Sequence, residues 1–222
     1  MARLIRRLIL AVFLVAVVLP VLLILLYRVV PPPGTPLMLW REAPADYRWV
    51  AMEEISTNAA RAVVVSEDQT FCEHSGIDWR QMNQVLEEFR ETGRPSRGAS
   101  TITMQLARNL YLPPSRSFLR KAVEIPLALG LELMVPKRRI LELYLNVVEL
   151  GDGIYGMEAA AQRHFGKPAG DLTRTEAARL AAILPNPLER DPARPSGSVG
   201  QRANQIARDI PRLTHLFACF ES

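Results

Sequence analysis

The sequence predicts a mainly helical globular domain that follows a single membrane-spanning helix at the N-terminus. Three observations indicate this fold class. The stretch from Leu8 to Tyr27 is uncharged and rich in Leu, Val and Ile. Most later segments repeat their apolar residues at the helical spacing, and the alternating runs typical of strands are scarce. Any strand is therefore expected to be short.

The uncharged stretch fits a membrane anchor in both length and flanking charge. Its 20 residues span roughly 30 Å as a helix, the thickness of the bilayer hydrocarbon, and Pro20 is expected to kink it. Arg3, Arg6 and Arg7 precede it, so the positive-inside rule keeps Met1 in the cytoplasm. The alternative is a cleaved signal peptide, which the length of the stretch disfavours.

The anchor sets the expected division of the chain. Residues 1–7 form a cytoplasmic tail, residues 8–28 the transmembrane helix, and residues 29–36 a stiff linker that contains four prolines. The globular domain covers residues 37–222 and lies across the membrane from the N-terminus.

Composition and charge exclude several classes of protein. Apolar residues make up 49% and charged residues 23% of the chain, which excludes wholesale disorder. Residues 1–30 carry the whole net charge of +4, so a nucleic-acid-binding domain is not expected. The two cysteines, Cys72 and Cys219, are too few for a disulfide-rich scaffold or a Cys-rich zinc site. Whether they form one bridge is left open.

Apolar spacing and capping signals divide the globular domain into eight expected helices. Ser100 is expected to cap the third helix, and Pro126 to bend the fourth. Pro136 suits the first turn of the fifth helix, and Thr173 with Glu176 has the spacing of a capping box in the seventh. The expected ranges are 53–65, 77–90, 100–110, 117–134, 136–148, 158–165, 173–184 and 199–216.

The first candidate site follows the apolar run 62–65. A carboxylate that emerges from an apolar wall becomes a better base near neutral pH, because burial disfavours its charged form. Glu67 has this position, and the alternative is that Glu67 and Asp68 are solvated charges at a helix end. His74 has no second His at metal-ligand spacing, which favours a hydrogen-bonding role over a metal site.

Cationic side chains are expected to gather on the next two helices. Thr101, Gln105 and Arg108 share one face of the third helix, whose N-terminus can also hold a phosphate. Arg116 and Arg120, one turn apart, suit a diphosphate, because each guanidinium can contact two oxygens. The alternatives are an ordinary amphipathic helix and a surface ion pair between Arg120 and Glu124.

The fifth expected helix is interpreted as structural. It is strongly apolar and carries one polar stripe, which is expected to hold neighbouring segments in place. The stripe consists of Arg138, Glu142, Asn146 and Glu149. No nucleophile-elbow, phosphate-loop or dinucleotide-binding motif occurs in the sequence.

Taken in order, four blocks of the sequence resemble those of the family 51 glycosyltransferases, the peptidoglycan polymerases of bacteria. The blocks are E-D-x-x-F-x-x-H-x-G from Glu67, G-x-S-T-I-x-x-Q-L-x-K-N from Gly98, R-K-x-x-E from Arg120 and K-x-x-I-L-x-x-Y-L-N from Lys137. Arg108 stands where the family usually has Lys, and Met104 where it usually has Gln. Some members of the family also carry a transpeptidase domain, which contains S-x-x-K and K-T-G motifs. These motifs are absent here, so the resemblance is to the members that have the glycosyltransferase activity alone.

The resemblance implies a lysozyme-like α fold that polymerises lipid II into β-1,4-linked glycan strands. The reaction inverts the sugar linkage and releases undecaprenyl pyrophosphate. No cofactor is required for the chemistry and no resident metal site is expected, although a divalent cation (Mg²⁺ or Mn²⁺) is considered at the diphosphate. The implied partners are lipid II, the growing glycan chain, and other cell-wall synthesis or division proteins. The implied location is the bacterial inner membrane, with the catalytic domain in the periplasm and no nucleic acid bound.

The resemblance also assigns roles to the candidate residues. Glu67 is the implied general base, and Glu124 is the second essential carboxylate, which orients cations or binds the divalent ion. Arg108, Arg116 and Arg120 are expected to stabilise the leaving diphosphate. The other expected substrate-binding residues are Asp68, Phe71, His74, Ser100, Thr101, Gln105 and Lys121.

Two other functions remain open from the sequence. One is a membrane-anchored peptidoglycan hydrolase of lysozyme type, which would need a general acid and access for water. The other is a non-catalytic, membrane-tethered scaffold that binds a cell-wall precursor. Turnover of lipid II separates both from a polymerase.

Overall fold

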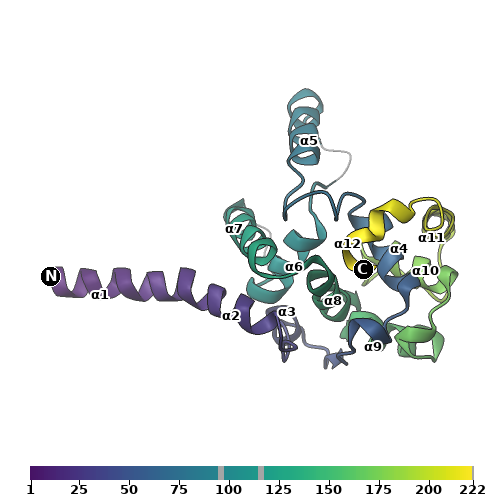
Figure 1. Ribbon diagram of the computed structural model, residues 1–222, viewed down its shortest axis with the longest axis horizontal. Coiled ribbons are helices and arrows are strands. Elements are labelled where there is room, and N and C mark those ends of the chain that lie inside the picture. Colours follow the sequence, from purple (N-terminus) through teal and green to yellow (C-terminus); the bar gives the residue numbers. More distant parts are fainter. Residues whose placement is uncertain (95–97, 115–117, 222) are drawn as a thin grey trace.

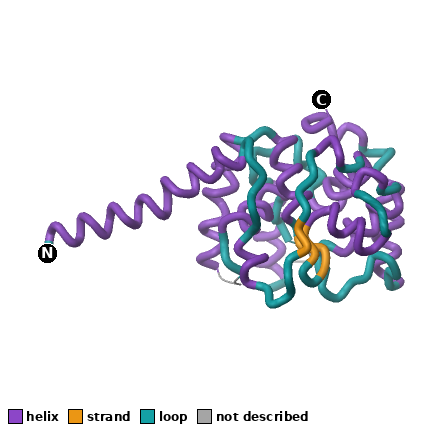
Figure 2. Tube along the Cα trace, turned by 90° about the horizontal axis from the view of Figure 1, so that it is seen from below, coloured by secondary structure: helices purple, strands orange, loops and turns teal. Residues whose placement is uncertain are grey.

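Helices form most of the structure, a computed structural model that describes residues 1–94, 98–114 and 118–221 (Figure 1). The predicted mainly helical class is confirmed. The strands among these residues are β1 (Asp46–Tyr47), β2 (Glu149–Gly151) and β3 (Ile154–Tyr155). They form one small sheet in the order β1-β3-β2, with β1 parallel and β2 antiparallel to β3 (Figure 2). Each strand is short, as predicted.

The N-terminal segment forms a helical rod that leads away from the body of the molecule (Figure 1). It consists of α1 (Ala2–Phe13), the π-helical η1 (Leu14–Val18) and α2 (Leu19–Tyr27), which follow one another directly. Most of its described side chains are exposed. Among the described residues, none of the individual helices has both the length and the apolar character needed to cross a membrane.

The end of the rod is fixed to the body by several contacts. Ile24 is only 2% exposed and belongs to the hydrophobic core. It lies against Gly130, where a Cβ would come within 3.3 Å of its Cδ1 atom. The ring of Tyr27 stacks on Tyr111, and Arg139 Nε donates a 3.0 Å hydrogen bond to the Tyr27 carbonyl. The rod and the body are therefore in direct contact as well as being joined by the proline-rich linker.

Each of the eight predicted helices has a counterpart in the body. The helices after the rod are α3 (Pro36–Trp40), α4 (Thr57–Glu67), α5 (Trp79–Thr92), α6 (Ile102–Tyr111), α7 (Phe118–Met134), α8 (Lys137–Val147), α9 (Gly156–Phe165), α10 (Arg174–Ile183), α11 (Gly197–Asp209) and α12 (Ala218–Glu221). Single 3₁₀ turns lie at η2 (Met52–Glu54), η3 (Ala169–Asp171) and η4 (Thr214–Phe217).

Capping side chains move two of the predicted helix starts. Ser56 Oγ accepts a hydrogen bond from the Asn58 N–H (3.2 Å), so α4 begins later than predicted, after the η2 turn. The prediction that Ser100 caps the third helix is wrong. Thr101 caps α6, because its Oγ1 accepts from the Met104 N–H at 3.1 Å.

The other boundary signals are confirmed in part. The capping box of Thr173 and Glu176 is present at the start of α10. Pro126 lies inside α7 as predicted, whereas Pro136 precedes α8 as its N-cap residue instead of lying in its first turn. The last predicted helix is too long, because α11 ends at Asp209 and is followed by turns.

α8 is a core helix with a structural polar stripe, as predicted. Seven of its residues are buried. Glu142 Oε1 accepts from the Met52 N–H at 3.1 Å, and the Asn146 amide bonds the Val50 N–H at 2.9 Å and the Val50 carbonyl at 3.0 Å. The stripe therefore holds the segment that leads into α4.

The two cysteines form a disulfide bridge. Cys72 lies in the turn that follows α4, and Cys219 lies in α12, 147 residues later. Their Cα atoms are 5.5 Å apart. The bridge links the C-terminal segment to the turn that follows α4. It therefore restricts the conformations of the chain next to Glu67, the first candidate site.

Candidate active site

Glu67 is the last residue of α4 and lines a cavity of about 590 Å³. Residues 62–65 directly before it are buried, which confirms the predicted apolar wall. Its side chain is 13% exposed. The carboxylate therefore lies at a helix end, as the alternative interpretation of the sequence predicted. It is not solvated in the way that interpretation implied, because its side chain is largely shielded from bulk water and open only to the cavity.

Two neutral donors hold the two oxygens of Glu67. Ser66 Oγ donates to Oε1 at 3.0 Å, and Gln105 Nε2 donates to Oε2 at 3.1 Å. The Tyr144 hydroxyl donates to Gln105 Oε1 at 2.8 Å, which leaves the amide NH₂ facing the carboxylate. Burial raises the pKa of Tyr144 well above its usual value of 10.0. The hydroxyl therefore keeps its proton, and the chain from Tyr144 through Gln105 fixes the orientation of Glu67.

Asp68 has a mainly structural environment although it also lines the cavity. It is 4% exposed and accepts a 2.9 Å hydrogen bond from the Ile102 N–H at the start of α6. His74 Nε2 lies 3.0 Å from its carboxylate oxygens. Because the Gly76 N–H donates to His74 Nδ1 at 3.1 Å, Nε2 carries the proton and donates to Asp68. The hydrogen-bonding role predicted for His74 is confirmed.

The N-terminus of α6 is occupied by groups of the protein itself. The Ile102 N–H is bonded to Asp68, and the Met104 N–H is bonded to Thr101 Oγ1. The expectation that this helix start also holds a phosphate is therefore corrected, because two of its first N–H groups already have acceptors.

Three of the predicted substrate-binding residues lie behind the cavity walls. Phe71 is completely buried, Thr101 is 4% exposed, and the His74 side chain is 7% exposed. Lys137 Nζ lies 4.5 Å from the centre of the Phe71 ring. None of the three lines the cavity that contains Glu67, so they support its wall instead of facing a ligand there.

Glu124 lies in α7 in different surroundings. It is 1% exposed, with Oε1 3.2 Å from Arg120 Nε and Oε2 3.1 Å from Lys121 Nζ. The i,i+4 ion pair that spacing allowed is therefore present, on a buried carboxylate instead of at the surface. Lys121 Nζ also donates to Ser100 Oγ at 3.4 Å, and the Ser100 carbonyl accepts from Gln105 Nε2 at 3.4 Å. Ser100 thus links the two carboxylate regions.

The residues at Glu124 do not fit a divalent cation. Both of its oxygens face cationic side chains, which repel a metal ion. Among the described residues, no group of three or more His, Cys, Asp or Glu side chains has a geometry that could hold a metal ion.

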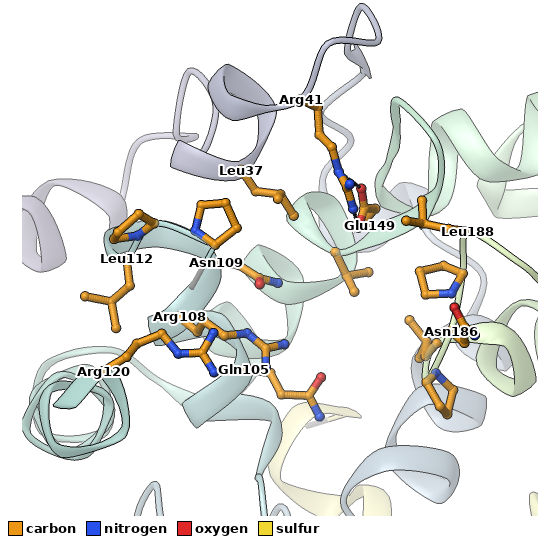
Figure 3. Close-up of a pocket in the computed structure, with 16 residues that line it drawn as sticks. Leu37, Arg41, Gln105, Arg108, Asn109, Leu112, Arg120, Glu149, Asn186 and Leu188 are labelled. Carbon is orange, nitrogen blue, oxygen red and sulfur yellow. Dashed lines mark hydrogen bonds and ion pairs between the residues drawn. The ribbon is translucent and has the colours of Figure 1, made fainter. Parts of the chain in front are cut away.

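Figure 3 shows the lining of a second cavity, which has a volume of about 450 Å³. Gln105 and Pro185 line both cavities. Arg108 from α6 and Arg120 from α7 turn their guanidinium groups toward the same part of the second cavity, next to Gln105 (Figure 3). One residue, Gln105, therefore separates a carboxylate from a pair of guanidinium groups. Arg116, predicted to join this pair, lies outside the described residues.

The second cavity carries a further ion pair on another part of its wall (Figure 3). Arg41 contacts both carboxylate oxygens of Glu149, with Nε at 2.8 Å and Nη2 at 2.9 Å. The amides of Asn109 and Asn186 line the same cavity, and most of the remaining lining is leucine and proline. Converging polar groups on an apolar wall suit a ligand with many hydroxyl groups, such as a saccharide.

Sequence reasoning missed several residues of this site. Arg202 lines the first cavity, with Nη2 3.6 Å from Glu67 Oε1, and the sequence alone singles out neither Arg202 nor Arg41. Tyr144 belongs to the helix interpreted from the sequence as structural, and Glu149 to its polar stripe. Tyr144 lies within the fourth matched block, which was a usable signal. Arg41 and Arg202 lie outside all four blocks, so only the folded chain reveals them.

The chain matches a family model described as "Transglycosylase" over residues 35–210. A biosynthetic peptidoglycan transglycosylase of Rhodospirillum centenum is 51% identical over 87% of this chain and 86% of its own length. Proteins with the same name from Caulobacter vibrioides and from a Marinomonas species are 46% and 44% identical. These matches cover 93% and 87% of this chain, and 91% and 85% of the relatives.

Proposed function

This chain belongs to the transglycosylase family, and from that premise we propose that it is a peptidoglycan glycosyltransferase that polymerises lipid II. One observation supports the assignment above the others. A carboxylate held by neutral donors lines one cavity, two guanidinium groups line the adjoining cavity, and Gln105 belongs to both. A sugar bound across this boundary has a base on one side and cations on the other.

Glu67 is the proposed general base. The acceptor is the 4-hydroxyl of the sugar of lipid II, and Glu67 removes its proton as the oxygen attacks the anomeric carbon of the donor. Ser66 donates a hydrogen bond to Oε1, and Gln105 donates one to Oε2. These two bonds fix the direction of the remaining lone pairs of the carboxylate. Attack on the face opposite the leaving group converts the α-linked pyrophosphate into a β-1,4 glycosidic bond.

Arg108 and Arg120 are the proposed leaving-group residues. As the bond from the anomeric carbon to the phosphate oxygen breaks, its electron pair moves onto undecaprenyl pyrophosphate. Two guanidinium groups are already fixed in the cavity, so they stabilise that developing negative charge without any need for water molecules to reorient. Glu124 acts indirectly, because its contacts with Arg120 and Lys121 hold these cations in position. Mg²⁺ or Mn²⁺ has no step in this mechanism.

The donor glycan is proposed to occupy the second cavity. The paired side chains of Arg41 and Glu149 and the amides of Asn109 and Asn186 supply hydrogen bonds to sugar hydroxyls there. Leucine and proline side chains supply the apolar faces against which sugar rings pack.

A lysozyme-type hydrolase fits the site less well. Such an enzyme needs a carboxylic acid that protonates the leaving oxygen, opposite or beside a second carboxylate. Glu124 is buried, contacts two cations and lines neither cavity, so it is not placed to protonate the leaving oxygen of a bound sugar. A non-catalytic scaffold has no need for the hydrogen-bond chain that orients Glu67.

We propose that residues 8–28 anchor the protein in the inner membrane, with the body in the periplasm. The rod from Ala2 to Tyr27 is helical without interruption and exposes apolar side chains. The body also exposes Trp79, Leu86 and Phe89 on α5, with exposed fractions of 54%, 46% and 54%, as expected for a surface near lipid. The disulfide agrees with an oxidising compartment. Other cell-wall synthesis or division proteins are expected partners in that compartment.

The test is polymerisation of lipid II by the purified full chain in detergent, with the products separated on a gel. We expect glycan ladders from the wild type and a loss of about 10²–10⁴-fold in rate for Glu67→Gln, which removes the general base. Polymeric glycan serves as the second substrate. Cleavage of that polymer without polymerisation of lipid II would establish the hydrolase, and binding without turnover would establish the scaffold.

A further inference from the structure

Arg202 reaches the candidate active site from the C-terminal part of the chain. It lies on α11, which packs against α4 and α10. Its Nη2 atom donates to the Ser66 carbonyl at 3.2 Å and to Ser66 Oγ at 3.0 Å. The same atom lies 3.6 Å from Glu67 Oε1, and Arg202 lines the cavity that contains Glu67.

These contacts form a second chain that ends on the Glu67 carboxylate. Ser66 Oγ accepts from Arg202 and donates to Glu67 Oε1 at 3.0 Å, which is shorter than its 3.3 Å distance to the alternative acceptor, the Ala181 carbonyl. A charged donor on the hydroxyl oxygen polarises that hydroxyl and strengthens the bond it donates. Each carboxylate oxygen of Glu67 is therefore controlled by its own chain, one starting at Tyr144 and the other at Arg202.

Arg202 differs from the other arginines of the site in the cavity that it faces. Arg108 and Arg120 line the second cavity, where the proposed function places the leaving diphosphate. Arg202 lines the first cavity, and the Glu67 ion pair at 3.6 Å is its contact with the proposed base. A cation in this position attracts the carboxylate toward the side of the first cavity and so restricts its orientation.

We propose that Arg202 is a positioning residue for the transfer reaction: directly and through Ser66, it holds the Glu67 carboxylate directed into the acceptor cavity. The inference rests on the proposed function. Arg202 is 43% exposed, and exposed ion pairs contribute little to stability. Replacing Arg202 is therefore expected to change the rate of the reaction much more than the stability of the fold.

The experiment compares Arg202→Gln, Arg202→Lys and a matched control, Arg208→Gln, on the same helix. Arg208 is exposed and lines none of the cavities described above. Each full-length variant is assayed for initial rate against lipid II concentration and for its thermal unfolding midpoint. For Arg202→Gln we expect kcat to fall about tenfold or more, with KM for lipid II within about twofold of the wild type. Arg202→Lys restores most of kcat, and Arg208→Gln matches the wild type.

A second variant protects the test against misfolding. Ser66→Ala removes the hydroxyl link but keeps the helix packing, and we expect kcat to fall about threefold, because only the indirect contact is lost. If Arg202→Gln does not fold, Ser66→Ala and Arg202→Lys carry the comparison.

Defined outcomes contradict the proposal. An unchanged kcat for Arg202→Gln overturns it, and so does a rise in KM at constant kcat, which would assign Arg202 to substrate binding. A loss in Arg202→Gln that Arg202→Lys does not restore overturns the role of the charge. If the wild type itself fails to polymerise lipid II, the proposed function fails instead, so the two failures are distinguishable.

Discussion

Glu67 and Glu124 are both glutamates close to the two cavities, and they differ in their access to a cavity and in the groups that contact their oxygens most closely. Glu67 lines a cavity, is 13% exposed, and receives hydrogen bonds from the neutral side chains of Ser66 and Gln105. Glu124 is 1% exposed and faces Arg120 and Lys121. The first has space for a substrate hydroxyl on its open side, and the second does not.

The difference shows that two identical side chains have different roles because their surroundings differ. A carboxylate held by neutral donors keeps the capacity to accept a proton. One placed between two cations instead fixes the position of those cations through charge-assisted contacts. The essential roles implied by the resemblance for both glutamates are therefore of two kinds: Glu67 acts on the substrate, and Glu124 acts on its own neighbours.

Glu124→Gln should break this comparison most severely. The substitution leaves Arg120 and Lys121 without their anionic partner beside a buried amide. We expect a loss of about 2–3 kcal/mol in the free energy of unfolding, less than for a fully buried pair because both cations are partly exposed. Activity with lipid II should fall about 100-fold, since Arg120 loses its fixed position. Chemical denaturation and the polymerisation assay measure the two effects.

Glu67→Gln is the contrasting control for that measurement. It should cost less than about 1 kcal/mol in unfolding free energy, because the hydrogen-bond donors to Glu67 are neutral and its ion pair with Arg202 is partly exposed. If Glu67→Gln destabilised the fold as much as Glu124→Gln, the division between a reacting and a structural carboxylate would be wrong.

Tyr144→Phe sharpens the comparison from the side of Glu67. It removes one hydroxyl, so the Gln105 amide is free to rotate away from the carboxylate. We expect kcat to fall about tenfold with a destabilisation of about 1 kcal/mol, the value of one lost hydrogen bond. KM should stay nearly constant, since Tyr144 is completely buried and does not touch a ligand. A change confined to KM would contradict a role in orienting Gln105.

Local signals in the sequence predicted the features that depend on short spacing. The ion pair between Arg120 and Glu124 follows from their i,i+4 separation, and the role of Asn146 follows from a polar stripe on an apolar helix. The contact between Glu67 and Gln105 joins α4 to α6, and its geometry depends on how those helices cross. The matched blocks of the sequence predicted that Glu67 and Gln105 belong to the same site. They did not predict the hydrogen bond between the two side chains.

The sequence could not give the features that depend on distant segments. The disulfide closes a separation of 147 residues, and loop-closure entropy changes too slowly with length to favour or exclude such a pair. Arg202 lies 135 positions after Glu67, outside every matched block, and only the packing of α11 on α4 brings it there. The N-cap of α6 is Thr101, one residue later than the predicted Ser100. Thr101 is held there because its hydroxyl also donates to the Gly76 carbonyl, a tertiary contact that the local sequence does not reveal.

Arg108→Lys should have the smallest effect, and it tests how the cationic side of the site works. The substitution introduces the residue that the family usually carries at this position. If the guanidinium pair acts mainly through charge, the ammonium keeps most of the stabilisation of the leaving diphosphate, and kcat should change less than about threefold. Arg108→Gln removes the charge and should cost about tenfold or more. An equal loss in both variants would show that the forked geometry of Arg108, and not its charge, does the work at the diphosphate, and the cationic side of the site would then depend on orientation as strictly as Glu67 does.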